Sequence, residues 1–257
     1  MDDKLQQIDT LLGELNQYRA NENYRITEAL EIEYTYDSNR IEGNTLTLHE
    51  TDMVVNKGIT IAGKGLREHL EAINHKEAID FIKDVAQKKE PISERVLLDI
   101  HAIVLHSIDK DNAGKYRRVP VIISGSKHIP PQPYLLQPKM DELFQWYEAN
   151  KDSMHPVVLA AQMHEKLVSV HPFIDGNGRT ARLVMNLILM QHGYPIANIK
   201  GDNETRRRYY ETLEEASSGD NSAFVEFIED VVIQSLTYYL KKISRPDRYR
   251  SVYNRNK

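Results

Sequence analysis

The chain has 257 residues, with 33 basic and 38 acidic side chains and a formal net charge of −5. This balance gives no direct case for nucleic-acid binding, which usually shows a basic surplus or stripe. The lack of cysteine excludes disulfide scaffolds, thiolate zinc sites and cysteine nucleophiles, and it fits a cytoplasmic protein. The N-terminus is acidic and amphipathic, and no apolar run approaches the ~18 residues of a membrane span, so we expect neither secretion nor membrane insertion.

Helical periodicity dominates the chain. The first helix is predicted from apolar residues that recur at three- and four-residue steps, which are Leu5, Ile8, Leu11, Leu12 and Leu15. A second helix is expected over residues 27–42, and the pair Gly43-Asn44, which favours a left-handed helix end, should terminate it. Further helices are predicted at residues 66–88, 93–106, 139–151, 157–170, 178–191, 204–217 and 224–242.

One segment departs from this helical pattern. Residues 114–133, GKYRRVPVIISGSKHIPPQP, place β-branched residues on both sides of a Gly-Ser turn, and prolines close the segment. This composition predicts a short β-hairpin, the only sheet that we expect in a mainly α-helical protein.

The most informative segment is HPFIDGNGRTAR, residues 171–182, which lies between two apolar helical stretches. Its loop therefore ends at a helix N-terminus, where free backbone N–H groups and the positive end of the helix dipole favour an anion. Gly176 and Gly178 would let a phosphate approach the backbone closely. Arg179 and Arg182 are three residues apart, share a helix face and could hold a polyphosphate from one side.

Two further side chains complete the chemistry of this segment. Asp175 supplies a hard oxygen ligand of the kind that Mg²⁺ prefers when it is also bound to phosphates. His171 can serve as the base that takes a proton from an incoming hydroxyl. The segment thus predicts a site for a magnesium–nucleotide complex beside a general base.

The same twelve residues resemble the signature of the Fic family, written HPFxxGNGRxxR, and every defined position matches. The similarity extends from about Thr35 to Leu240. It implies a Fic fold, which is a helical bundle with a short β-hairpin flap, and an enzyme that transfers AMP from ATP to a hydroxyl of a target protein. Relatives with lysine at the second glycine position transfer a different part of the nucleotide, whereas glycine stands at position 178 here.

The resemblance also implies roles for individual residues. His171 would be the general base, Asp175 would hold Mg²⁺, and Arg179 and Arg182 would hold the β- and γ-phosphates. The hairpin would clamp the nucleotide and pair with an extended piece of the target. The implied ATP-binding residues are Ile123, Ser124, Gly125, Ser126, Asp175, Gly176, Asn177, Gly178, Arg179, Thr180, Arg182, Tyr209 and Tyr210.

Residues 38–44, SNRIEGN, match the inhibitory motif of the same family, which is Ser or Thr, three residues, Glu, and then Gly or Asn. Ser38 and Glu42 are four residues apart, so they face the same way on a helix. The resemblance implies that Glu42, with Ser38 and Gly43, inhibits the enzyme by pairing with Arg182 where a γ-phosphate would otherwise bind.

Two alternatives stay open. Gly176, Gly178 and Ala181 satisfy the dinucleotide-binding pattern G-x-G-x-x-A, but a helical pattern precedes them and residues 183–201 contain no Asp or Glu, which disfavours an oxidoreductase. A catalytically idle Fic-fold protein that binds nucleotide as a regulator is the second alternative. The complete set of residues in the 171–182 segment argues against it.

The sequence predicts one Fic-type domain over residues 1–257. Within it we expect N-terminal helices at residues 1–65, a Fic core at 66–243 and a loosely held basic tail at 244–257. The target protein, modification of the chain itself, the oligomeric state and removal of AMP by the same site are left open.

Overall fold

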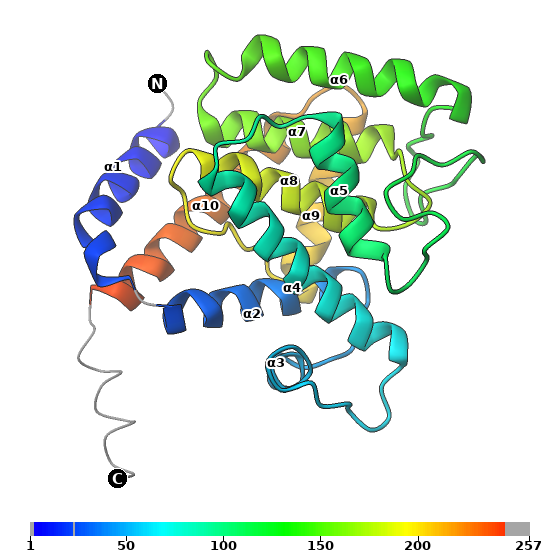
Figure 1. Ribbon diagram of the computed structural model, residues 1–257. Coiled ribbons are helices and arrows are strands. Elements are labelled where there is room, and N and C mark those ends of the chain that lie inside the picture. The colour runs from blue at the N-terminus through cyan, green and yellow to red at the C-terminus, as the bar shows by residue number, and fades with distance from the viewer. Residues whose placement is uncertain (1–2, 23, 245–257) are drawn as a thin grey trace.

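The computed structural model of the chain describes residues 3–22 and 24–244 (Figure 1). The described residues form α-helices and two short 3-10 turns. In chain order they are α1 (Asp3–Tyr18), η1 (Arg19–Asn21), α2 (Tyr24–Ile41), α3 (Leu48–Lys57), α4 (Leu66–Gln87), α5 (Glu94–Leu105), η2 (Pro133–Leu135), α6 (Leu136–Asn150), α7 (Pro156–Val170), α8 (Asn177–Gln191), α9 (Asn203–Ser217) and α10 (Ser222–Ile243). The nine helices expected from the sequence are therefore confirmed, with small shifts at their ends.

Helix α8 is the centre of the fold. Its side chains are buried on every face from Arg179 to Leu189, which explains why its sequence, LVMNLILM, is apolar almost all round. It packs against α4, α5 and α7, which surround it in Figure 1. The N-terminus of α8 carries the predicted nucleotide segment, so the candidate site starts from the most deeply buried element of the protein.

Helix α2 carries the predicted inhibitory motif. It packs against α3 and α4 and also touches α8. The helix ends at Ile41 because Gly43 adopts a left-handed conformation with φ 99°, as the Gly43-Asn44 pair predicts. Helix α1 packs along α10, so the first and last described helices lie side by side (Figure 1, blue and orange).

Helix α3 was not among the helices expected from the sequence. A reciprocal capping box starts this helix: the Glu50 backbone N–H donates to Thr47 Oγ1 at 3.2 Å, and the Thr47 N–H donates to Glu50 Oε2 at 2.7 Å. Gly58, with φ 63°, ends it. The pattern Thr-x-x-Glu at residues 47–50 was the local signal that could have revealed the helix.

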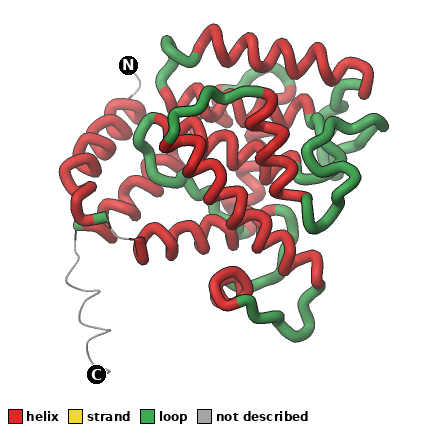
Figure 2. The backbone as a smooth tube through the Cα atoms, viewed as in Figure 1, coloured by secondary structure: helices red, strands yellow, loops and turns green. Residues whose placement is uncertain are grey.

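The predicted β-hairpin is not formed. None of the described residues is in a strand, and residues 106–132 make an irregular excursion between α5 and α6, which we name the flap loop (Figure 2). Side chains bind backbone groups that would otherwise be available for the hydrogen bonds of a β-ladder. Arg117 donates to the carbonyls of Val119 and Pro131 at 3.0 and 2.6 Å, and Glu214 accepts from the Lys127 N–H at 2.8 Å. Prolines 120, 130 and 131 have no N–H to donate.

Two expectations concern the rest of the chain. No helix among the described residues is both long and apolar enough to cross a bilayer. The predicted basic tail lies outside the described residues from position 245 onward.

Candidate active site

The site is built on the turn that joins α7 to α8. His171 follows α7 in a left-handed conformation with φ 48°, which is uncommon for a residue with a side chain. Gly176, with φ 77°, precedes α8 and directs the chain into the helix. The loop between them, residues 171–176, therefore places His171 and the first amides of α8 on the same side of the molecule.

The loop is held by side chains that do not face a ligand. The Asn177 amide bonds both backbone groups of Phe173, each at 2.9 Å. The His101 ring stacks on Phe173 with ring centroids 3.6 Å apart. Because His101 Nδ1 accepts from the Gly114 N–H at 3.0 Å, its Nε2–H donates to the carbonyl of Asp175 at 3.0 Å. Burial lowers the pKa of His101 to about 4, so the ring stays neutral.

Arg117 connects the flap loop to the same turn. It is 2% exposed, and its Nε donates to the carbonyl of His171 at 2.8 Å, while its own backbone N–H donates to the carbonyl of Pro172 at 2.9 Å. Burial lowers the pKa of this guanidinium. Arg117 thus fixes the backbone at His171 and the base of the flap loop together.

His171 itself is poised to accept a proton. Its Nδ1 lies 3.3 Å from the carbonyl of Val168, which can only accept, so Nδ1 carries the hydrogen and Nε2 presents a lone pair. Burial is the main cause that lowers the pKa of His171, and the nearby Arg117 adds to it, whereas the Val168 carbonyl and Glu42 oppose it. The imidazole is therefore neutral at pH 7, as a general base must be.

Asp175 lies among cations beside the start of α8. Its carboxylate contacts Arg67, accepts from the Gly176 N–H at 2.6 Å and lies 3.3 Å from Arg179 Nη2. Burial alone would raise its pKa, but Arg179, the Gly176 N–H and Arg67 together lower it, so Asp175 is ionised. Arg179 is 2% exposed, and its Nη1 is 3.5 Å from Glu71.

Arg182 is enclosed by the inhibitory helix. Its Nε donates to Ser38 Oγ at 3.0 Å, and its Nη2 donates both to the carbonyl of Ser38 at 2.9 Å and to Glu42 Oε1 at 2.7 Å. Its Nη1 donates to Tyr209 Oη at 3.2 Å. Burial alone would lower the pKa of Arg182, but Tyr209 and Glu42 raise it above its usual value. The predicted contact between Glu42 and Arg182 is therefore present.

The Glu42 carboxylate also lies against the first turn of α8. A Cβ at Gly178 would collide with Glu42 Oε1 and would lie 3.0 Å from Arg182 Nη1. A side chain at position 178 would therefore have to displace the end of the Glu42 side chain. A negative group thus lies beside the first turn of α8 and a buried arginine, an environment that favours an anion.

The remaining predicted residues lie around this centre. The turn of the flap loop is closed by the Ser126 N–H, which donates to the Ile123 carbonyl at 3.2 Å, and the Ser126 hydroxyl contacts Glu214 of α9. Gly125 takes φ 80° at this turn, next to the exposed Ser124. Thr180 is fully buried, and its hydroxyl has no hydrogen-bond partner among the described residues.

The two predicted tyrosines have different environments. Tyr209 is 1% exposed and packs among aromatic rings, with its Oη 3.1 Å from His164 Nε2. Tyr210 is 42% exposed, and its hydroxyl donates to the carbonyl of Ile41 at 3.2 Å. Burial raises the pKa of both hydroxyls. Tyr210 is therefore the one that offers a surface to a ligand.

Sequence reasoning did not find several residues that shape this site. Arg67 and Glu71 of α4 contact the Asp175–Arg179 pair, Arg117 fixes the loop, and Glu214 holds the flap turn. Their distance in sequence from the residues they contact explains the omission, since no local spacing links them to the 171–182 segment. Only the tertiary structure brings them there.

Comparisons with known proteins identify the family of the chain. The Fic/DOC family model matches residues 91–189. The chain is 40% identical over 211 residues to Protein adenylyltransferase Fic of Culex quinquefasciatus, an alignment that covers 81% of this chain and 41% of that protein. The match to the protein of the same name from Nematostella vectensis is 38% over 210 residues and covers 81% and 48%. The chain thus spans less than half the length of these curated relatives.

Solved structures give the same result over more of the chain. A Fic domain-containing signaling protein from Bacteroides thetaiotaomicron VPI-5482 superposes with a TM-score of 0.83 at 29% identity and covers 93% of this chain and 97% of that one. Fic-1 from C. elegans also superposes with a TM-score of 0.83, at 30% identity, over 95% of this chain and 72% of that one. The signature segment, the helical fold and these matches together show that the chain belongs to the Fic/DOC family.

Proposed function

We propose that this protein transfers AMP from ATP to a hydroxyl of a protein, and that Glu42 inhibits the transfer. In this reaction the hydroxyl oxygen forms a bond to the α-phosphorus, the bond from that phosphorus to the bridging oxygen breaks, and pyrophosphate leaves. His171 Nε2 takes the hydroxyl proton. The names of the relatives, Protein adenylyltransferase Fic, support this reaction class.

The observation that carries the proposal is the occupied anion site. The Glu42 carboxylate lies over Gly178 and 2.7 Å from Arg182 Nη2, in the position that a terminal phosphate would need. A charge-assisted bond of this kind engages the guanidinium, and two anions cannot share the space. ATP that enters beside Glu42 would be misplaced, and small misplacements of reacting groups can cost on the order of 100-fold in rate.

Arg179 is the second phosphate-binding group in this proposal. It is 2% exposed, and its Nε and Nη1 make no hydrogen bond within the described residues, although Nη1 forms a 3.5 Å ion pair with Glu71. Buried donors of this kind are normally satisfied, and a phosphate at the α8 N-terminus would satisfy them. Asn177 contributes differently, because its amide is used to hold Phe173 and so to keep the loop amides in place. Thr180 Oγ1, also without such a partner, lies on the same turn of α8.

The residues present also fit Mg²⁺. Asp175 is an ionised carboxylate, and its side chain is 40% exposed, so an oxygen is accessible from solvent. No group of three or more His, Cys, Asp or Glu side chains gathers within residues 3–22 and 24–244, which suits an ion that is held by one carboxylate together with substrate phosphates. Bound there, Mg²⁺ would neutralise phosphate charge. Asp175 would hold it, while Arg67 and Arg179 keep the carboxylate oriented.

The flap loop completes the proposed site. The turn at residues 123–126, held by Glu214, would close over the nucleotide, and the exposed backbone near Ile122 and Ile129 would pair with an extended segment of the target. These two isoleucines are 93% and 82% exposed. Tyr210 would face the adenosine. The modified protein could be a separate target or the chain itself.

The test is transfer of label from ATP that is radioactive at the α-phosphorus, with the chain itself as acceptor. The parent protein, Glu42→Gly, and Glu42→Gly combined with His171→Ala or Arg182→Ala are compared after their folding has been checked. Glu42→Gly should label on the order of 100-fold faster than the parent, because Arg182 is released. Both double variants should lose this gain, since one lacks the base and the other lacks the released arginine.

Two controls separate this activity from its rivals. ATP labelled at the γ-phosphorus should leave no label, because pyrophosphate is released. If Glu42→Gly bound ATP but labelled neither itself nor proteins of a lysate, the chain would be an idle nucleotide-binding protein. Weaker labelling by Glu42→Gly than by the parent would show that Glu42 assists the transfer.

Removal of AMP from a modified protein is a second candidate reaction of the same site. One observation favours it: Glu42 is close enough to His171 to raise its pKa, and its side chain is 33% exposed. A carboxylate in this position can orient a water for attack on a phosphodiester. A pre-labelled protein that lost its label with the parent but not with Glu42→Gly would demonstrate this reaction.

A further inference from the structure

The inhibitory helix is attached to the rest of the protein at a second place. Asp37, which directly precedes Ser38, is 5% exposed and accepts three hydrogen bonds from residues 197–201, a segment that we name the strap. Its Oδ2 accepts from Asn198 Nδ2 at 2.7 Å and from Lys200 Nζ at 3.1 Å. Its Oδ1 accepts from the Gly201 N–H at 2.9 Å.

The other face of the strap is tied to α8. The side chain of Asn186, which is fully buried, donates to the Ala197 carbonyl at 3.1 Å and accepts from the Ala197 N–H at 2.8 Å. The same amide donates to the carbonyl of Arg182 at 3.1 Å. Asn186 therefore bonds both the strap and the backbone of Arg182, the residue whose guanidinium receives Glu42.

The strap and α2 also touch without a side chain between them. A Cβ at Gly201 would lie 2.9 Å from both Arg40 Cβ and the Asp37 carbonyl. Gly201 is not in the left-handed region, so its backbone would accept an alanine and only the contact with α2 forbids one. The distance between α2 and the strap is thus set by this close contact as well as by hydrogen bonds.

We propose that Asp37 is a positioning residue for the inhibition by Glu42, and this inference rests on the proposed function above. A closed path of bonds runs from the Arg182 carbonyl through Asn186 and the strap to Asp37. It returns along α2 through Ser38 and Glu42 to the Arg182 guanidinium. Asp37 lies near the end of α2 and Glu42 directly after it, so two attachments five residues apart fix the rotation and the axial position of this helix end. Asp37 thus acts together with the bonds of Ser38 to hold Glu42 against Arg182.

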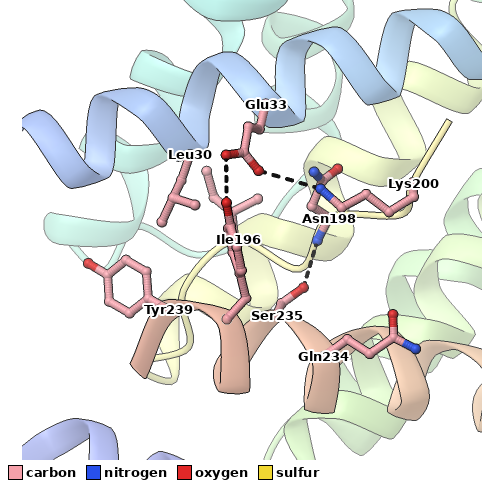
Figure 3. Close-up of a pocket in the computed structure, with 9 residues that line it drawn as sticks. Leu30, Glu33, Ile196, Asn198, Lys200, Gln234, Ser235 and Tyr239 are labelled. Atoms are coloured by element: carbon pink, nitrogen blue, oxygen red, sulfur yellow. Dashed lines mark hydrogen bonds and ion pairs between the residues drawn. The ribbon is translucent and has the colours of Figure 1, made fainter. Parts of the chain in front are cut away.

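A pocket beside the strap supplies a matched control (Figure 3). The pocket has a volume of about 330 Å³ and is lined by Asn198 and Lys200 from the strap and by Glu33 from α2. Glu33 is four residues before Asp37; it contacts Lys200 Nζ at 3.5 Å and accepts from Tyr238 Oη at 2.9 Å. Glu33 thus pairs with the same lysine as Asp37, but none of its described bonds reaches the backbone of the strap. Glu33→Gln should therefore leave the inhibition intact.

The test exchanges Asp37 and Asn198, whose side chains form the hydrogen bond of 2.7 Å. Asp37→Asn places an amide against the donors Asn198 and Lys200, and Asn198→Asp places two carboxylates together. Each single variant should raise self-labelling by α-labelled ATP on the order of tenfold, the factor expected for loss of a charge-assisted hydrogen bond. The combined variant, with the amide and the carboxylate exchanged, should label more slowly than either single variant, because the amide at position 37 then donates to the carboxylate at position 198 and still accepts from the Gly201 N–H, although the bond from Lys200 to residue 37 is lost. Gly201→Ala should raise labelling by a different route, since it pushes α2 away from the strap.

The Glu42→Gly background separates positioning from a general effect on folding. There, Asp37→Asn and Asn198→Asp should add nothing, because the group that they position is already absent. A purely structural role would change labelling equally in both backgrounds. The inference is overturned if the single variants label like the parent, or if the exchange of partners fails to reduce their effect while all proteins stay folded.

Amide hydrogen exchange gives a readout that needs no activity. In Asp37→Asn the amides of residues 38–42, which form the end of α2 and the start of the following turn, should exchange faster than in the parent and in Glu33→Gln, while those of the core of α8 should not. If these amides exchanged faster in Asp37→Asn but neither the parent nor any variant transferred label, the proposed function would be refuted and the positioning role of Asp37 would stand. Unchanged exchange would refute the positioning role, whatever the activity.

Discussion

At the scale of single residues, burial and neighbouring charges set the protonation states of the side chains in the site. His171 is partly buried, bonds Val168 through Nδ1 and lies near the Arg117 guanidinium. Burial and Arg117 lower the pKa of His171, while the Val168 carbonyl raises it but keeps the hydrogen on Nδ1, so Nε2 is unprotonated at neutral pH. Asp175 is kept ionised by its cationic neighbours in the same small volume. A neutral base and an ionised carboxylate can thus coexist a few residues apart because their environments differ.

The lowered pKa of His171 predicts the pH dependence of AMP transfer. The base works when it is neutral, that is, above its pKa, so the labelling rate of Glu42→Gly should rise through a midpoint below the usual histidine value of about 6.5 and be level at pH 7 to 8. Rates between pH 5 and 8 at saturating ATP test this. A midpoint above about 7 would contradict the assignment of His171 as a base whose pKa burial lowers.

At the scale of elements, the flap loop is shaped by bonds from outside itself. Arg117 joins its two ends, and Glu214 holds its turn from α9, while the described part of the chain contains no strand that pairs with it. The exposed Ile122 and Ile129 leave room for a partner strand. The segment contains residues that favour strands, but a ladder requires a pairing partner that the described residues do not supply.

Glu214→Ala should slow AMP transfer on the order of tenfold in the Glu42→Gly background, because the turn at residues 123–126 would lose its anchor and clamp the nucleotide less well. Glu211→Ala is the matched control, since that exposed glutamate of the same helix pairs with Arg207 instead. Initial labelling rates of the two variants provide the measurement. Equal rates would show that the anchored turn has no part in the transfer.

At the scale of the whole molecule, three buried histidines link stability to pH. Burial lowers the pKa values of His75, His101 and His164 below the value in the unfolded chain, to about 4 for His101. As pH falls below about 6.5, the unfolded chain therefore binds protons that the folded protein does not, and folding stability falls with pH. The loss should continue down to the lowered pKa values of the folded state.

Between pH 6.5 and 5 the free energy of unfolding should decrease by up to about 1.4 kcal/mol per pH unit for each of these histidines. Denaturant unfolding at several pH values measures this slope. His164→Gln should reduce the slope, and His49→Gln, which alters an exposed side chain, is the control and should keep the slope of the parent. A slope that His164→Gln does not change would show that His164 is not buried in the neutral form.

The sequence by itself determined the helical architecture and the chemistry of the segment 171–182. Both are local: apolar residues at helical spacing identify the helices, and a base, a carboxylate, glycines and arginines within twelve residues must lie in one loop and the helix turn that follows it. The contact between Glu42 and Arg182 could be expected only because two separate motifs matched one family.

The tertiary structure decided everything that depends on partners far away in the sequence. The flap segment has strand-forming residues, yet Arg117 and Glu214 bind its backbone in an irregular loop. Tyr209 and Tyr210 are adjacent in sequence, but packing buries one and leaves the other accessible. The three bonds of Asp37 to the strap join residues more than 160 positions apart, and no periodicity or spacing encodes such a contact, because it arises only when the helices pack.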